Sequence, residues 1–160
     1  MSFGDDVRDL YQEVILDHGR KPRHGQRLAA YDVTAKGDNP MCGDRVEVWV
    51  KFAEDGTISE TGFEAKGCAI SVASADLMAE TIQGRDRADT TALFATFREL
   101  VRTGKCPLHD IALSPALERL APLSGVHEYP SRVKCATLPW HALTAALDGI
   151  KETSSARDDQ

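Results

Sequence analysis

The stretch RVEVWVKF, residues 45–52, decides the class of fold. Alternate residues of a strand share a face, and here one face would carry Val46, Val48, Val50 and Phe52. The AEDGT that follows contains an Asp-Gly pair, which suits the positive φ of a tight turn. Residues 61–65 alternate again, so the two stretches predict an antiparallel hairpin. Residues 31–35 alternate in the same way and predict a further strand.

Helices are expected on both sides of these strands. Residues 5–19 have apolar side chains at helical spacing and end in Gly19, a common helix stop. Near the C-terminus, Pro139 fits the first turn of a helix, and Thr137 is a candidate cap for it. The helices expected after the hairpin cover residues 69–83, 89–103, 114–120 and 138–150.

Strands that come first and helices that follow are typical of an α+β domain. We therefore expect a small antiparallel sheet of about three strands, packed against several helices. A chain of 160 residues fits one domain, which we place at residues 1–150. The polar tail KETSSARDDQ, residues 151–160, is expected to be disordered.

Charge and hydropathy narrow the classes of function. The chain carries 19 Lys and Arg against 25 Asp and Glu, a net charge of −6. This balance argues against a nucleic-acid-binding protein, because phosphate contacts need clustered basic side chains. The start MSFGDDVRDL lacks a secretory signal, and no apolar run reaches the roughly 20 residues of a membrane span. We expect a cytoplasmic protein, in which four cysteines favour metal binding or catalysis over disulfides.

Three of the four cysteines are expected at junctions between elements. Cys42 lies in the loop DNPMCGD, Cys68 lies where the hairpin meets a helix, and Cys135 lies just before the last predicted helix. Glycine follows Cys42 and precedes Cys68, and glycine lets the backbone approach a bound atom. A helix N-terminus also favours the thiolate, the form that binds metal.

Asp44 adds an oxygen donor to these thiols. It follows Cys42 by two residues, so both side chains can point the same way from an extended loop. Three thiolates and one carboxylate form an acceptable donor set for tetrahedral zinc, which we expect at one end of the sheet. The spacing leaves a second interpretation open, since scattered cysteines also serve as small buried hydrophobic residues.

Three strings, NPMCGDRV, GCAISVASADLM and RVKCATLPW, resemble in this order the signatures of the U-type iron–sulfur cluster assembly family, which includes IscU and SufU. The string LYQEVILDHGRKPRH resembles that family's N-terminal helix, and the resemblance extends over about residues 10–150. Lys134 stands where the cluster-scaffold branch usually has histidine. The segment between Cys68 and Cys135 is also longer than in that branch. Both features resemble the SufU branch.

The resemblance implies a zinc-dependent sulfurtransferase. Such a protein accepts persulfide sulfur from a pyridoxal-phosphate-dependent cysteine desulfurase similar to SufS, and it serves downstream cluster-assembly proteins. The resemblance implies Cys42, Asp44, Cys68 and Cys135 as metal ligands, and Cys42 as the sulfur acceptor. Two alternatives stay open. One is a scaffold on which a [2Fe–2S] cluster is assembled and transferred, and the other is a non-catalytic zinc adaptor.

Four further residues have weaker assignments. The family tends to have arginine at the position of Arg132, which could hold Asp44, steady a persulfide anion, or be solvated before a helix. Cys106 matches no signature and is expected to be a structural or exposed free thiol. The five histidines show no ligand spacing. His18 and His24 could contact a partner, and ordinary surface positions are the alternative.

Overall fold

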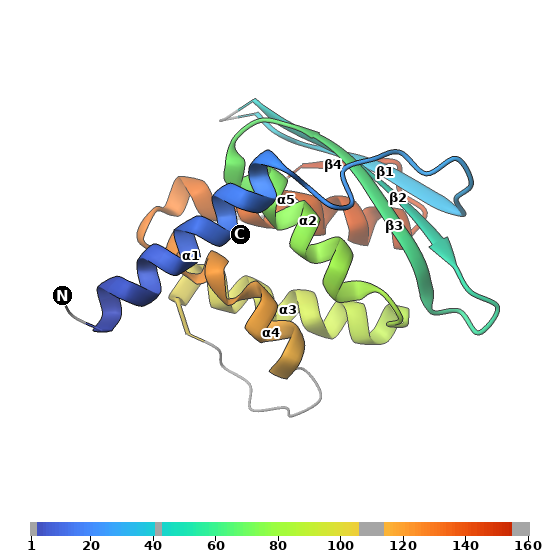
Figure 1. The fold of residues 1–160 in the computed structure, drawn as a ribbon. Helices are drawn as coiled ribbons and strands as arrows, with labels where there is room; N and C mark the ends of the chain where they lie inside the picture. The colour runs from blue at the N-terminus through green and yellow to red at the C-terminus, as the bar shows by residue number, and fades with distance from the viewer. Residues whose placement is uncertain (1–2, 41–42, 106–113, 155–160) are drawn as a thin grey trace.

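The structure is a computed structural model that describes residues 3–40, 43–105 and 114–154 (Figure 1). Its helices are α1 (Phe3–Arg20), α2 (Ala69–Ile82), α3 (Arg87–Thr103), α4 (Ser114–Leu120), the 3₁₀-helix η2 (Ala121–Glu128) and α5 (Pro130–Leu147). Its strands are β1 (Val33–Asn39), β2 (Asp44–Phe52), β3 (Ile58–Lys66) and β4 (Glu152–Ser154). The prediction of an α+β fold is confirmed.

The strands form one sheet in the order β3-β2-β1-β4. The predicted hairpin is β2 and β3, which pair antiparallel with Val48 opposite Phe63, and β1 pairs antiparallel with β2. The short strand β4 is parallel to β1. Its formation shows that the expectation of disorder is wrong for residues 152–154, because backbone pairing with β1 orders them. Residues 155–160 of the expected tail lie outside the described residues.

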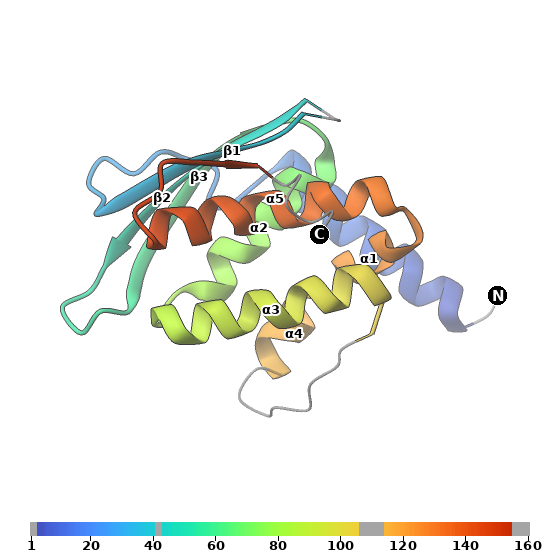
Figure 2. The same cartoon turned by 180° about the vertical axis from the view of Figure 1, so that it is seen from behind.

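The helices gather on one side of the sheet (Figures 1 and 2). Helices α2 and α5 lie against the strands, and α3 lies beyond them. The valines of β2 face this side and are buried, as their alternation predicted. On the other side, the segment after α1 crosses the sheet and places the Arg27 guanidinium 5.4 Å from the Trp49 ring centroid. Trp49 is therefore buried as well, although it points away from the helices.

The last helix differs from the prediction. Helix α5 begins at Pro130, so Pro139 lies in its interior and Cys135 lies inside the helix, not before it. A proline lacks the N–H that would bond the carbonyl four residues earlier, here that of Cys135. Ser71 of α2 shares its hydroxyl hydrogen between this carbonyl, at 3.1 Å, and Asp44 Oδ2, at 2.9 Å. The neighbouring helix thus satisfies the group that proline leaves open, and the helix continues.

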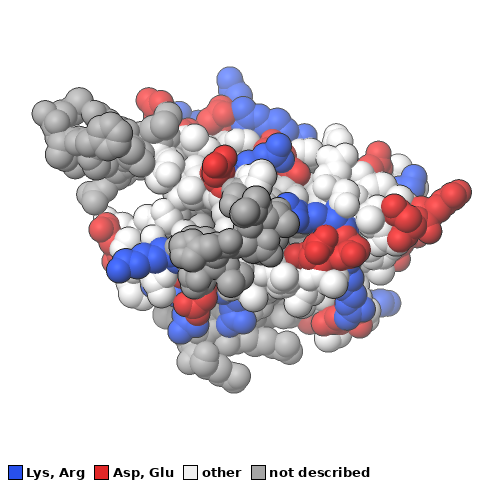
Figure 3. Space-filling model, turned by 90° about the horizontal axis from the view of Figure 1, so that it is seen from below, with Lys and Arg blue, Asp and Glu red and all other residues white. Residues whose placement is uncertain are grey.

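The described surface mixes charges of both signs. Acidic and basic side chains are interspersed on the face seen in Figure 3. No helix among the described residues is long and apolar enough to cross a bilayer.

Candidate metal centre

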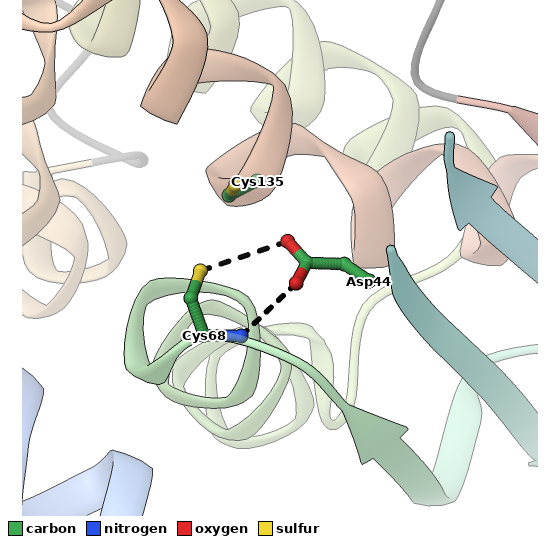
Figure 4. A group of neighbouring side chains, drawn as sticks. All are labelled: Asp44, Cys68 and Cys135. Carbon is green, nitrogen blue, oxygen red and sulfur yellow. Dashed lines mark hydrogen bonds between the residues drawn. The ribbon is translucent and has the colours of Figure 1, made fainter. Parts of the chain in front are cut away.

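Three elements bring a carboxylate and two thiols together at one end of the sheet. Asp44 begins β2, Cys68 directly precedes α2 as its N-cap, and Cys135 lies in α5. One ligand atom from each, an oxygen and two sulfurs, lies within 4.8 Å of the others (Figure 4). The predicted location at the end of the sheet is confirmed. Cys42, the fourth expected ligand, lies outside the described residues, and so does Cys106.

Asp44 is 1% exposed and is held by hydrogen bonds from α2. The Cys68 N–H donates to Asp44 Oδ1 at 3.0 Å, and the Ser71 hydroxyl lies 2.9 Å from Oδ2. Burial acts to raise the pKa of Asp44, but hydrogen bonds from the Cys135 thiol, the Cys68 N–H and the Ser71 hydroxyl outweigh it. The pKa of this carboxyl group is therefore below its usual value, and Asp44 is an ionised oxygen donor.

The two thiols differ in acidity. A hydrogen bond from the Cys135 thiol lowers the pKa of Cys68 to about 6, against the effect of burial. The same hydrogen bond, together with burial, raises the pKa of Cys135. The two pKa values move in opposite directions because the two sulfurs share one hydrogen bond. A cation that binds both sulfurs would ionise both, since thiolates are the ligand form.

The donor types fit a thiophilic metal. Zinc accepts thiolate and carboxylate ligands in tetrahedral sites, and iron–sulfur clusters are also held by thiolates. The described part of the site supplies Asp44, Cys68 and Cys135. These residues fit either metal group, so ligand chemistry alone does not select between them.

Gly67 leaves room for the Asp44 carboxylate. Its φ is +144°, and a Cβ built on it would lie 2.0 Å from Asp44 Oδ1. Such a contact is far inside van der Waals distance, so any larger residue here would displace the carboxylate. The glycine before Cys68 is explained by this close approach.

A Gly67→Ala variant is expected to bind zinc about tenfold more weakly or worse, because the Asp44 carboxylate, the expected oxygen ligand, is pushed from its place. The measurement is a titration against a chromophoric chelator. Gly56→Ala is the matched control, because Gly56 also has a positive φ, +88°, and its Cβ would meet no atom within 4 Å. Wild-type zinc affinity in Gly67→Ala would refute the clash with Asp44, and an equal loss of affinity in both variants would assign the loss to backbone strain.

The family described as NifU-like N-terminal domain matches residues 10–136. This chain belongs to that family. It is 34% identical over 151 residues to the iron–sulfur cluster assembly scaffold protein IscU of Streptococcus pyogenes serotype M1, covering 94% of this chain and 89% of the relative. It is 35% identical over 143 residues to the zinc-dependent sulfurtransferase SufU of Bacillus subtilis (strain 168). That match covers 89% of this chain and 92% of the relative. The resemblance to the U-type assembly proteins is confirmed.

Solved structures agree with this assignment. A crystal structure from Fervidobacterium islandicum AW-1, assigned as an iron–sulfur cluster assembly scaffold protein for the SUF system, superposes with a TM-score of 0.73 at 30% identity. The superposition covers 88% of this chain and 98% of that one. An N-terminal NifU-like protein from Brucella abortus shares the fold, with a TM-score of 0.75 at 21% identity.

Sequence reasoning missed two buried polar residues of this NifU-like domain that contact the candidate ligands. Asn39 Nδ2 donates to Cys135 Sγ at 3.7 Å, and Ser71 contacts Asp44 as described above. Ser71 follows Cys68 by three residues, so both lie at the start of one helix. This spacing could have indicated that Ser71 lies near the candidate ligands. Arg132 lies exposed in the first turn of α5, and its role beside the metal stays a prediction.

A second polar cluster lies between α1 and α2. The prediction of a surface position is wrong for His18, whose side chain is 12% exposed and whose Nδ1 is bonded to Asp76. Asp76 is fully buried and also accepts the His24 backbone N–H at 2.8 Å. His18, Asp76 and Glu80 place ligand atoms within 4.8 Å of one another. Both Asp76 oxygens already accept hydrogen bonds from the protein. We therefore interpret the cluster as a structural contact that holds α1 against α2, a brace between the helices, and not as a metal site.

Proposed function

We propose that this chain is a zinc-dependent sulfurtransferase that accepts persulfide sulfur from a pyridoxal-phosphate-dependent cysteine desulfurase similar to SufS. The sulfur would serve iron–sulfur cluster assembly. The observation that carries the proposal is a buried carboxylate beside two thiols of unequal exposure, in a chain 35% identical to a protein named as such a transferase. A carboxylate ligand also differs from the closed all-sulfur set of many structural zinc sites.

The proposed zinc ligands are Cys42, Asp44, Cys68 and Cys135. Bound zinc would hold the thiols ionised without undergoing redox chemistry of its own. Hydrogen bonds from α2 orient Asp44, and the start of the same helix carries Cys68. The protein thus presents its donors in a fixed arrangement.

The proposed acceptor is Cys42, because transfer needs an accessible thiolate. Cys135 is fully buried and Cys68 is half-buried, whereas Pro40 and Gly43, which flank the Cys42 segment, are exposed.

The Cys42 thiolate attacks the outer sulfur of the desulfurase persulfide and forms a new S–S bond. The S–S bond of the desulfurase breaks, its cysteine leaves as a thiolate, and the proton stays on the transferred sulfur. Atoms and electrons balance without an added oxidant or reductant.

A scaffold function is the second candidate. The IscU relative is 34% identical and covers slightly more of this chain than the SufU relative does. The same ligands would then hold a [2Fe–2S] cluster while it is assembled and transferred. A non-catalytic zinc adaptor is a third candidate, in which the metal only stabilises the fold.

Metal analysis of protein purified without added metal tests these functions. The transferase is expected to contain about one zinc per chain, show no visible absorption and raise the turnover of a cysteine desulfurase. A brown protein that contains iron and sulfide would favour the scaffold. Zinc without any effect on the desulfurase would favour the adaptor.

A further inference from the structure

Asn39 connects the loop of the metal centre to helix α5. It is the last residue of β1, is 1% exposed, and pairs in register with Asp44 at the start of β2. Its backbone carbonyl accepts the Gly43 N–H at 2.8 Å, which closes the β1–β2 connection. Its side-chain Nδ2 donates to Cys135 Sγ at 3.7 Å. One residue thus joins both ends of this connection to a sulfur that is 96 positions away in the chain.

The hydrogen bond to Cys135 is protected from water. Both side chains are buried, with exposures of 1% for Asn39 and 0% for Cys135, so no solvent donor can replace the amide. Cys68 has different surroundings, because its sulfur lies 3.6 Å from Asp44 Oδ2 and 4.0 Å from Ser71 Oγ. The described part of the centre therefore gives its two sulfurs different hydrogen-bond partners.

An N–H that points at a metal-bound thiolate changes that ligand in two ways. It fixes the direction of the sulfur, as outer hydrogen bonds generally fix metal ligands. It also shares the negative charge of the sulfur, which leaves a weaker nucleophile. Burial acts in the same direction, because a persulfide carried by another protein cannot reach Cys135 while the amide holds it in its buried place.

We propose that Asn39 is a positioning residue of the metal centre, which holds Cys135 as a fixed ligand and prevents it from accepting sulfur. This inference deepens the proposed sulfurtransferase function and rests on it. Asn39 acts through Cys135 and touches no substrate. Its amide keeps Cys135 bound to the metal, and the proposed acceptor Cys42 receives the sulfur.

The test compares Asn39→Leu, which keeps a similar shape without the donor, with Thr34→Val on the same strand. Thr34 donates its hydroxyl to the Val48 carbonyl at 2.8 Å, so the control also loses one side-chain hydrogen bond. Asn39→Leu is expected to bind zinc about 10–100-fold more weakly in chelator competition. In Co²⁺-loaded protein its sulfur-to-metal charge-transfer band is expected to move to lower energy, because the sulfur has lost its donor. Thr34→Val should match the wild type in both measurements.

The distribution of transferred sulfur gives a third measurement. In a single turnover with labelled desulfurase, Asn39→Leu is expected to carry part of the label on the Cys135 peptide, where the wild type carries none. A wild-type chain that takes up no sulfur would refute the proposed function, while zinc affinity and the cobalt spectrum would still decide the role of Asn39.

Wild-type zinc affinity and an unshifted cobalt band in Asn39→Leu would overturn the inference. If Asn39→Leu does not fold, Asn39→Ala replaces it in the same measurements. Failure of both variants to fold in the presence of zinc would also overturn the inference, because Asn39 would then be a residue of the fold and not of the centre.

Discussion

Replacing Cys42 with alanine is expected to abolish sulfur uptake while leaving zinc binding measurable. The three other proposed ligands, Asp44, Cys68 and Cys135, can hold the ion with water in the fourth position. In single-turnover transfer from a loaded desulfurase, the wild-type chain should gain about one sulfur, mapped by mass spectrometry to the Cys42 peptide. The Cys42→Ala chain should gain none, and desulfurase turnover should fall to the rate seen without this protein.

Cys106→Ser is the matched control for the loss of a thiol. It changes a cysteine that matches no family signature, so zinc content and sulfur uptake should both be retained. Label on Cys68, Cys106 or Cys135, together with an active Cys42→Ala variant, would refute Cys42 as the acceptor. The family assignment would be unaffected by that result.

The centre of the sheet could be predicted from local sequence because burial of one face imposes a period of two residues. The valines of β2 alternate with polar residues or Trp49, and the Asp-Gly turn fixes the return of β3. These signals lie within about 20 neighbouring residues and need no knowledge of distant contacts. The hairpin was therefore found with its correct pairing direction.

The start of α5 could not be predicted because it depends on a distant residue. A proline in a helical pattern usually marks the first turn, so Pro139 suggested a start near residue 138. In the structure, Ser71 donates to the carbonyl that Pro139 leaves open. The formation of β4 is similar, since Thr153 pairs with Gly37 of β1. Neither contact leaves a pattern in the local sequence.

The candidate ligands were found through family signatures, and the residues around them were not. Asp44, Cys68 and Cys135 stand in recognisable strings, and the structure brings them together. Asn39 and Ser71 act by contacts across elements, which a single sequence does not display. Asp76 did leave a signal, because it is the one charged residue among the buried residues of α2.

The pair formed by Asp76 and His18 is expected to hold α1 against α2. Asp76 is fully buried, and its two oxygens serve the His18 ring and the backbone N–H of His24. Removing the carboxylate would leave both nitrogen groups without this acceptor. A buried polar group that loses its partner costs about 1–3 kcal/mol, and two such groups are affected here.

We therefore expect Asp76→Ala to lower the free energy of unfolding by about 2–6 kcal/mol, which corresponds to a fall in Tm of about 10 °C for a chain of this size. Asp76→Asn keeps one carbonyl oxygen as an acceptor for the His24 N–H. Its free energy of unfolding should therefore fall by about half as much as that of Asp76→Ala. Asp17→Ala is the control, because it breaks the exposed pair with Arg23, and solvent-exposed pairs add little stability. Thermal melting followed by circular dichroism measures all three variants. If Asp76→Ala melts at the same temperature as Asp17→Ala, the buried pair contributes no more than a surface pair, and the brace between α1 and α2 must come from apolar packing alone.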